Sequence, residues 1–71
     1  MKSAIEKGLY RHFKGNVYNV LGVAKNSETL ELLVLYSRVE HPDELWVRPL
    51  GMFNEIVIHE GVEVQRFTRI S

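Results

Sequence analysis

The alternation of apolar and polar positions divides this chain into short segments separated by turns. Residues 9–13 and 17–24 alternate between two faces, which is typical of β-strands. Gly22, inside the second segment, indicates a bulge or a bend. Glycine, asparagine or proline marks a turn at residues 14–16, 25–27, 41–44 and 60–61. Turns this close together predict short strands and a mainly β fold.

The second half of the chain continues the pattern. Residues 45–50 alternate as a strand, and Pro49 should lie at its end or at a sheet edge because proline has no N–H to donate. A short helical turn is expected over residues 52–55. Residues 56–59 and 62–67 should then pair as a hairpin across the turn at 60–61.

Residues 27–36 allow two interpretations. Leu30, Leu33 and Val34 have helical spacing, and Ser27 is a suitable N-terminal cap. The unbroken apolar run over 32–36 equally fits a strand that is buried on both faces. The β-rich surroundings favour a polar turn followed by a strand.

The length and composition limit the class of protein. A chain of 71 residues makes one small domain, and a domain of this size buries a small core. Because the chain has no cysteine, disulfides and thiolate metal sites are excluded. Stability must come from close packing or from assembly.

The sequence also carries an expectation about location. No stretch approaches the roughly 20 apolar residues of a membrane span. Residues 1–8 lack the apolar run of a signal peptide. We expect a cytoplasmic protein with no membrane partner.

The charges cancel overall but are unevenly distributed. The formal net charge is zero, which argues against a general nucleic-acid binder with a strong basic excess. Residues 1–25 hold five basic side chains and one acidic one, whereas residues 26–45 hold five acidic and one basic. Either the two halves neutralise each other in the fold, or the basic half forms a face for an anionic ligand.

Several blocks of sequence resemble one family. They are Tyr-Arg-His-Phe-Lys-Gly-Asn at 10–16, Tyr-Asn-Val-Leu-Gly-Val-Ala at 18–24, Ser-Glu-Thr at 27–29, Leu-Val-Leu-Tyr at 33–36, Leu-Trp-Val-Arg-Pro-Leu at 45–50, Met-Phe at 52–53, and Gly61 with Arg-Phe at 66–67. Over residues 9–67 the chain is similar to the small bacterial family called domain of unknown function 1653. The loop at 40–44 departs from the family's usual glycine-containing turn.

The resemblance implies a fold but no activity. Members of the family resemble SH3-like barrels, so we expect a small SH3-like β-barrel of about five strands with a short helical turn. It would form a single domain over residues 9–71, preceded by a flexible N-terminal segment at 1–8. No established activity comes with the family.

Aromatic and basic side chains supply the candidate binding residues. An aromatic ring can stack on a ligand while arginine pairs with a phosphate or carboxylate. The polar triplet at 27–29 is either a turn that bonds its own backbone or a binding loop beside the basic cluster. The alternative for the aromatics is that they fill the core. The candidates are Tyr10, Arg11, His12, Lys14, Tyr18, Glu28, Trp46, Arg48 and Arg66.

Arg48 raises a specific question. An arginine between Val47 and Pro49 in a strand needs either an acidic partner or a ligand. The sequence favours a structural ion pair with Glu28 or Glu55 and leaves a ligand contact as the alternative.

Catalytic and metal sites receive little support from the sequence. The three histidines lack metal-site spacing, and no nucleophile–base set stands out. We therefore expect no metal, no cofactor and no catalytic residue. The favoured function is a non-enzymatic binding module for an anionic ligand such as nucleic acid. A protein- or peptide-interaction module, or weak self-association to a homo-oligomer, is the alternative, and a small enzyme ranks behind both.

Overall fold

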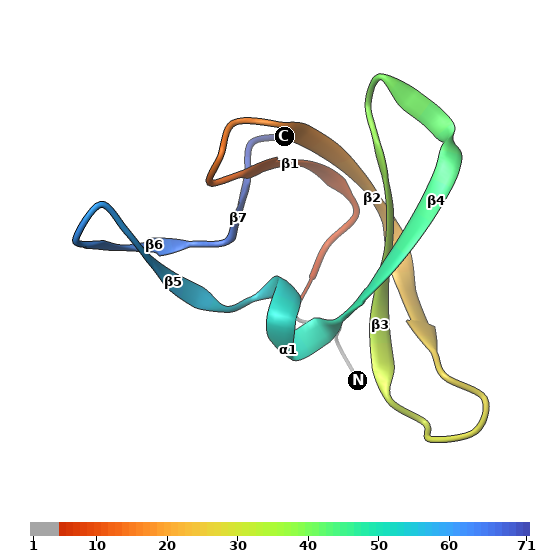
Figure 1. The fold of residues 1–71 in the computed structure, drawn as a ribbon. Helices are drawn as coiled ribbons and strands as arrows, with labels where there is room; N and C mark the ends of the chain where they lie inside the picture. The colour runs from red at the N-terminus through yellow and green to blue at the C-terminus, as the bar shows by residue number, and fades with distance from the viewer. Residues whose placement is uncertain (1–4) are drawn as a thin grey trace.

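A computed structural model describes residues 5–71, which form two antiparallel sheets and a short helix (Figure 1). The main sheet has the strand order β4-β3-β2-β1-β7 and consists of β1 (Gly8–His12), β2 (Val17–Lys25), β3 (Leu32–Arg38), β4 (His41–Pro49) and β7 (Phe67–Arg69). The second sheet is the hairpin of β5 (Ile56–His59) and β6 (Val62–Gln65), and α1 (Leu50–Phe53) joins β4 to β5. No helix within these residues is long and apolar enough to cross a membrane.

Most of the predicted turns are present. Gly15 has a φ of 110°, which glycine adopts without strain, and it lies in the turn between β1 and β2. Glu60 and Gly61 join β5 to β6 with φ values of 52° and 79°. Two successive positive values match the twist of a tight hairpin, so the predicted hairpin is confirmed.

The ambiguous segment is a turn followed by a strand. The Asn26 side-chain oxygen accepts hydrogen bonds from the N–H groups of Glu28 (2.9 Å) and Thr29 (3.2 Å), and β3 begins at Leu32. The helical interpretation of this segment is therefore wrong, because the asparagine side chain holds the backbone in a turn. The register of β2 against β3 shifts between Val20 and Gly22, which confirms the predicted irregularity there.

The turn predicted at 41–44 is wrong. These residues lie inside β4, which begins at His41, and the turn is formed by Val39 and Glu40 instead. The reason is that β4 is an edge strand and that Pro42 lies in an irregular stretch of it, between the Arg38–His41 and Ser37–Leu45 pairs. Pro42 can therefore enter the strand without leaving a neighbour's carbonyl unpaired.

The fold is mainly β, with the short helix at Leu50–Phe53 where residues 52–55 were expected to turn. The structure has seven strands, compared with the predicted five or so, because a break at Arg66 separates β6 from β7 and β5–β6 forms its own sheet. Within the described residues, the main sheet is not closed into a barrel, since its edge strands β4 and β7 are not paired with each other.

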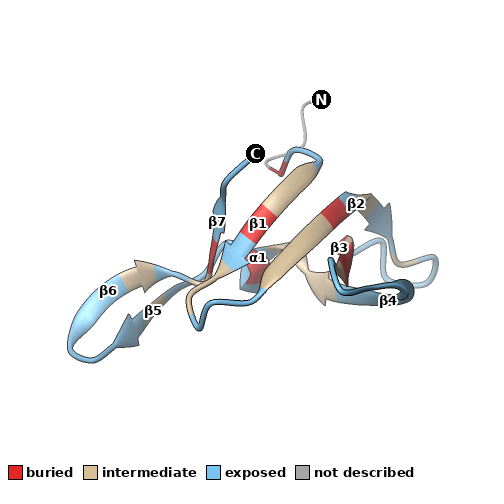
Figure 2. Ribbon diagram, turned by 90° about the horizontal axis from the view of Figure 1, so that it is seen from above, coloured by how far each residue is buried: buried red, intermediate tan, exposed pale blue. Residues whose placement is uncertain are grey.

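The core lies on the concave face of the main sheet (Figure 2). The rings of Phe53, from α1, and Phe67, from β7, stack with centroids 4.0 Å apart and an angle of 1° between their planes. The buried apolar residues are Ile5, Tyr10, Val20, Val34, Tyr36, Phe53 and Phe67. Residues 1–4 of the expected flexible segment lie outside the described part of the chain, so its flexibility stays a prediction.

Candidate functional site

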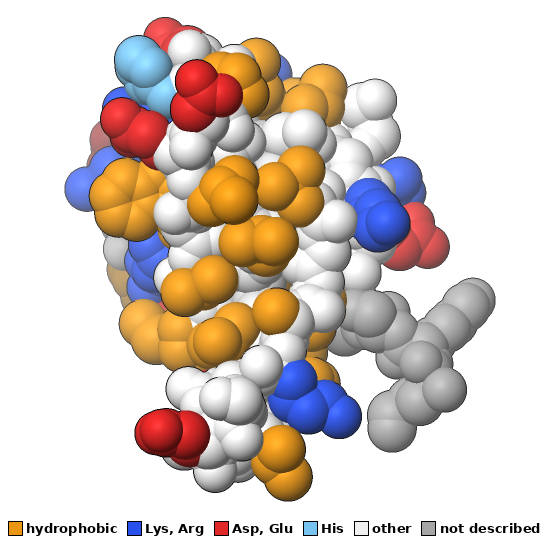
Figure 3. Space-filling view, turned by 90° about the vertical axis from the view of Figure 1, so that its right-hand side faces the viewer, with side chains coloured by type: hydrophobic (Ala, Val, Ile, Leu, Met, Phe, Trp, Pro, Cys, Tyr) orange, Lys and Arg blue, Asp and Glu red, His pale blue; other side chains and the backbone are white. Residues whose placement is uncertain are grey.

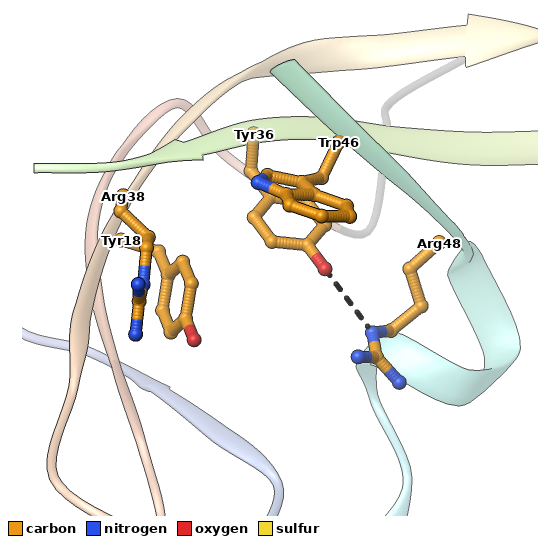
Figure 4. Close-up of a pocket in the computed structure, with 5 residues that line it drawn as sticks. All are labelled: Tyr18, Tyr36, Arg38, Trp46 and Arg48. Carbon is orange, nitrogen blue, oxygen red and sulfur yellow. Dashed lines mark hydrogen bonds between the residues drawn. The ribbon is translucent and has the colours of Figure 1, made fainter. Parts of the chain in front are cut away.

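The strand register brings five aromatic and basic side chains together on one face of the sheet. Tyr18 of β2 lies opposite Arg38 of β3, and Tyr36 of β3 lies opposite Trp46 of β4. Arg48 follows two positions after Trp46 and therefore shares its face. These five residues line a shallow pocket with a volume of about 240 Å³ (Figure 4).

The floor of the pocket is fixed by the core, whereas its rim is accessible. Tyr36 is only 5% exposed, and its ring makes edge-to-face contacts with Tyr18 (5.4 Å between centroids), Phe53 (5.9 Å) and Phe67 (6.0 Å). Trp46 is 52% exposed. A ligand would therefore meet a rigid aromatic base and an open indole face, without any rearrangement of the core.

Two guanidinium groups give the pocket positive charge. The Nε of Arg48 donates a long hydrogen bond of 3.4 Å to the Tyr36 hydroxyl (Figure 4). Its guanidinium carbon lies 5.9 Å from the centre of the Phe67 ring. Among residues 5–71, neither Arg48 nor Arg38 has a carboxylate in salt-bridge range. The pocket therefore presents positive charge that no acidic side chain of the described chain neutralises.

The expected ion pair of Arg48 is consequently wrong. Glu55 pairs with Arg66 at 2.9 Å, and Glu28 lies in the turn between β2 and β3 without a salt bridge to Arg48 within the described residues. The sequence analysis expected Arg48 to need a partner, and in the structure it contacts Tyr36 and Phe67. Its nearest partners are aromatic side chains, which alternation along a strand cannot reveal.

The pKa of His12 is affected by the cations near the pocket. Burial, followed by the positive charges of Arg66, Arg48 and Lys14, lowers the pKa of His12 below its usual value. Its Nδ1 accepts a hydrogen bond of 3.1 Å from the backbone N–H of Lys14, as a neutral imidazole can. The convergence of these cations indicates an electropositive region that extends from the pocket towards β1.

The remaining predicted site residues are dispersed. Tyr10 is buried, and its hydroxyl donates to the backbone carbonyl of Glu6 at 2.8 Å. Lys14 is exposed in the β1–β2 turn, with its ammonium 5.8 Å from the Phe13 ring centre. The structure thus brings Tyr18, Trp46 and Arg48 into one pocket and places the others elsewhere.

A second hollow lies on the other side of β1. It has a volume of about 290 Å³ and is lined by Arg11, His12 and Phe13 together with residues of β6, β7 and the following segment. Arg66, next to this region, pairs with Glu55, and its buried Nε has no hydrogen-bond partner within the described residues. No group of three or more potential metal ligands occurs in residues 5–71.

Tyr36 and Arg38 are pocket residues that the sequence analysis did not select. The apolar run over 32–36 predicted a buried strand, and Tyr36 is indeed buried while its hydroxyl accepts the hydrogen bond from Arg48 in the pocket. Extending the two-residue alternation of β3 from Val34 would have placed both side chains on one face. The facing strand, and hence the pocket, required the register of β4.

The chain was also compared with known proteins. The family described as protein of unknown function (DUF1653) matches residues 8–69. The chain belongs to this family. A crystal structure of a DUF1653 protein from Bordetella bronchiseptica is 33% identical and superposes with a TM-score of 0.85, covering 94% of this chain and 88% of that one. No curated protein matches. The predicted family is therefore confirmed, and DUF1653 itself carries no described activity.

Proposed function

We infer that this DUF1653 protein is a non-enzymatic module that binds an anionic ligand in the pocket between Tyr18 and Arg48, and that the ligand is single-stranded nucleic acid. One observation carries the proposal: two arginines without an acidic partner in the described chain flank three aromatic rings. A base and its phosphate require this combination of a flat apolar surface and a nearby cation.

Different side chains of the pocket would bind the base and the phosphate of a nucleotide. The exposed face of Trp46 and the ring of Tyr18 offer stacking surfaces, while Arg38 and Arg48 offer guanidinium groups for phosphate oxygens. The open sheet would hold these groups as an SH3-like barrel holds its binding loops. That likeness of scaffold is part of the proposal, because fold alone does not assign function.

The expected binding is weak and only moderately dependent on salt. Two phosphate contacts predict a slope of about −1.4 in a plot of log affinity against log salt concentration for a single strand. The zero net charge of the chain adds no general attraction. A short strand should therefore bind locally in the pocket and should not coat the surface of the protein.

The test is an amide NMR titration with short single-stranded RNA and DNA at low and moderate salt. We expect shifts at Tyr18, Arg38 and the Trp46 indole N–H that diminish as salt is added. Arg38→Gln should abolish them. Lys25→Gln, which removes the same charge at the exposed far end of β2, should leave them unchanged. A silent wild-type spectrum, or equal losses in both variants, would refute the proposal.

A further inference from the structure

β4 presents an open edge to solvent. It pairs with β3 on one side, and on its other side no strand follows within the described residues. Leu45, Trp46 and Val47, at the middle of this edge, are 57%, 52% and 55% exposed. An exposed edge that carries large apolar side chains and no lysine is a template for pairing with another strand.

The convex face beside this edge is also apolar. Leu45 and Val47 point away from the pocket face, and Val47 lies opposite Leu35 in the register of β3. Figure 3 shows hydrophobic side chains gathered on the side of the molecule where β2, β3 and β4 lie. A contiguous patch of this kind commonly marks a protein interface.

The sequence of β4 is complementary to itself. Two copies paired antiparallel about a twofold axis keep their faces continuous only when residues from the same face lie opposite each other. Centring the pair on Trp46 places Glu44 opposite Arg48 twice and Leu45 opposite Val47 twice. Arg48 lies on the pocket face, both apolar pairs extend the convex patch, and Glu44 lies beside the irregularity between the Ser37–Leu45 and Arg38–His41 pairs.

Neighbouring registers lose this match. A pair centred on Leu45 sets Glu44 against Trp46 and Arg48 against Pro42, and a pair centred on Val47 again leaves both charges without an opposite charge. Prolines at 42 and 49 also limit the length of the paired segment, since neither can donate to a new ladder. The edge therefore specifies one register.

We propose that two copies of this chain associate through β4 in the register centred on Trp46 and form one continuous sheet across a twofold axis. Within the described residues, Glu44 makes no ion pair and Arg48 makes none either, so the second copy supplies the carboxylate that the monomer lacks. Each cross-strand pair contributes modestly, and the two charge pairs act together with the merged apolar patch.

A charge exchange tests both the contact and its register. Glu44→Arg and Arg48→Glu each place like charges opposite one another in a homodimer, so each variant should dimerise at least about tenfold more weakly than wild type. An equimolar mixture of the two variants restores both opposite-charge pairs, and should therefore form heterodimers. Sedimentation equilibrium measures the dimerisation, and native mass spectrometry distinguishes heterodimers by mass.

The matched control is Glu63→Arg, which makes the same charge change on the separate β5–β6 hairpin and should dimerise like wild type. A wild-type protein that stays monomeric at millimolar concentration would overturn the proposal. So would a mixture that forms no heterodimer while each variant gives a folded circular dichroism spectrum. Nucleotide binding by wild-type protein, measured at a concentration at which it is monomeric, separates this proposal from the pocket's function.

Discussion

At the scale of single residues, His12 reports the positive field around the pocket. Its pKa is lowered from 6.5 by burial and by the cations Arg66, Arg48 and Lys14. Protonation of this imidazole would bring a further positive charge close to these cations, of which Arg66 is paired with Glu55. The positive charge that we propose for ligand binding therefore disfavours protonation of His12, so the stability of the fold should depend on pH.

The pH prediction follows from this shift. Because the pKa of His12 is lower in the folded state, the unfolded chain binds the proton more readily. The contribution of His12 to the free energy of unfolding is complete above pH 6.5 and is lost as the pH falls through the folded pKa. His12→Asn should remove this part of the dependence in urea unfolding between pH 8 and 5. Parallel curves for the two proteins would contradict it.

Arg48 allows a second prediction at the same scale. Its contacts within the described residues are a long hydrogen bond to Tyr36 and the face of Phe67, so no buried carboxylate is stranded when it is removed. Arg48→Ala should therefore lower the free energy of unfolding by about 1 kcal/mol or less. Urea denaturation at low protein concentration measures this, and a loss of several kcal/mol would show a structural role that these contacts do not explain.

At the scale of elements, the start of β1 is pressed against the last residues of the chain. The Ile70 N–H donates to the Leu9 carbonyl at 2.8 Å, and the Leu9 N–H donates to the Ser71 carbonyl at 3.2 Å. Gly8 has a φ of 140°, and a Cβ at this position would collide with the backbone carbonyl of Ser71. The close approach of these two segments therefore depends on glycine.

Gly8→Ala should destabilise the protein by about 1–3 kcal/mol, because the substitution combines an unfavourable φ with a backbone collision. Gly51→Ala is the matched control. It lies in α1, where an added Cβ meets open space, and alanine favours the helix. Thermal unfolding should rank Gly51→Ala at or above wild type and Gly8→Ala well below it. The reverse order would contradict the described packing.

The elements also show which features the sequence could predict. The hairpin at Glu60–Gly61 and the irregularity at Gly22 depend on local backbone preferences, and both were predicted. Pro42 was misread as a turn because its tolerance in a strand depends on β4 being an edge. Edge position is a property of the whole sheet, so no local pattern indicates it.

At the scale of the whole molecule, one aromatic cluster joins the core to the pocket. Phe67 stacks on Phe53 and makes edge-to-face contacts with Tyr18 and Tyr36, while Arg48 lies over its ring. A domain of this length has a total stability of roughly 4–10 kcal/mol. A single ring in this position is therefore a large share of what keeps the chain folded.

Phe67→Ala should lower the free energy of unfolding by about 3–5 kcal/mol. Phe13→Ala is the comparison, since Phe13 is half-buried and contacts only two histidines and Lys14 among the aromatic and cation contacts of the described chain. Circular dichroism in urea should show the larger loss for Phe67. A loss for Phe67→Ala no greater than that for Phe13→Ala would contradict the central place of this ring.

The global arrangement was also where prediction from sequence reached its limit. The mainly β class follows from alternation and turns, and the family follows from specific blocks such as Trp-Val-Arg-Pro at 46–49. Whether the sheet closes depends on strand tilt and stagger, which no single segment encodes. The pocket could not be predicted for the same reason, because Tyr36 and Trp46 lie side by side only through the register of β3 against β4.

The position of Trp46 has a practical consequence. It is the only tryptophan in the chain, and its half-exposed indole lies at the rim of the pocket. Intrinsic fluorescence therefore observes this one location without any label. A stacked base should quench the emission, whereas pairing of two β4 edges should shift it to shorter wavelength as the protein is concentrated. A single fluorescence experiment therefore distinguishes the two events: quenching reports a ligand in the pocket, and a shift to shorter wavelength reports self-association.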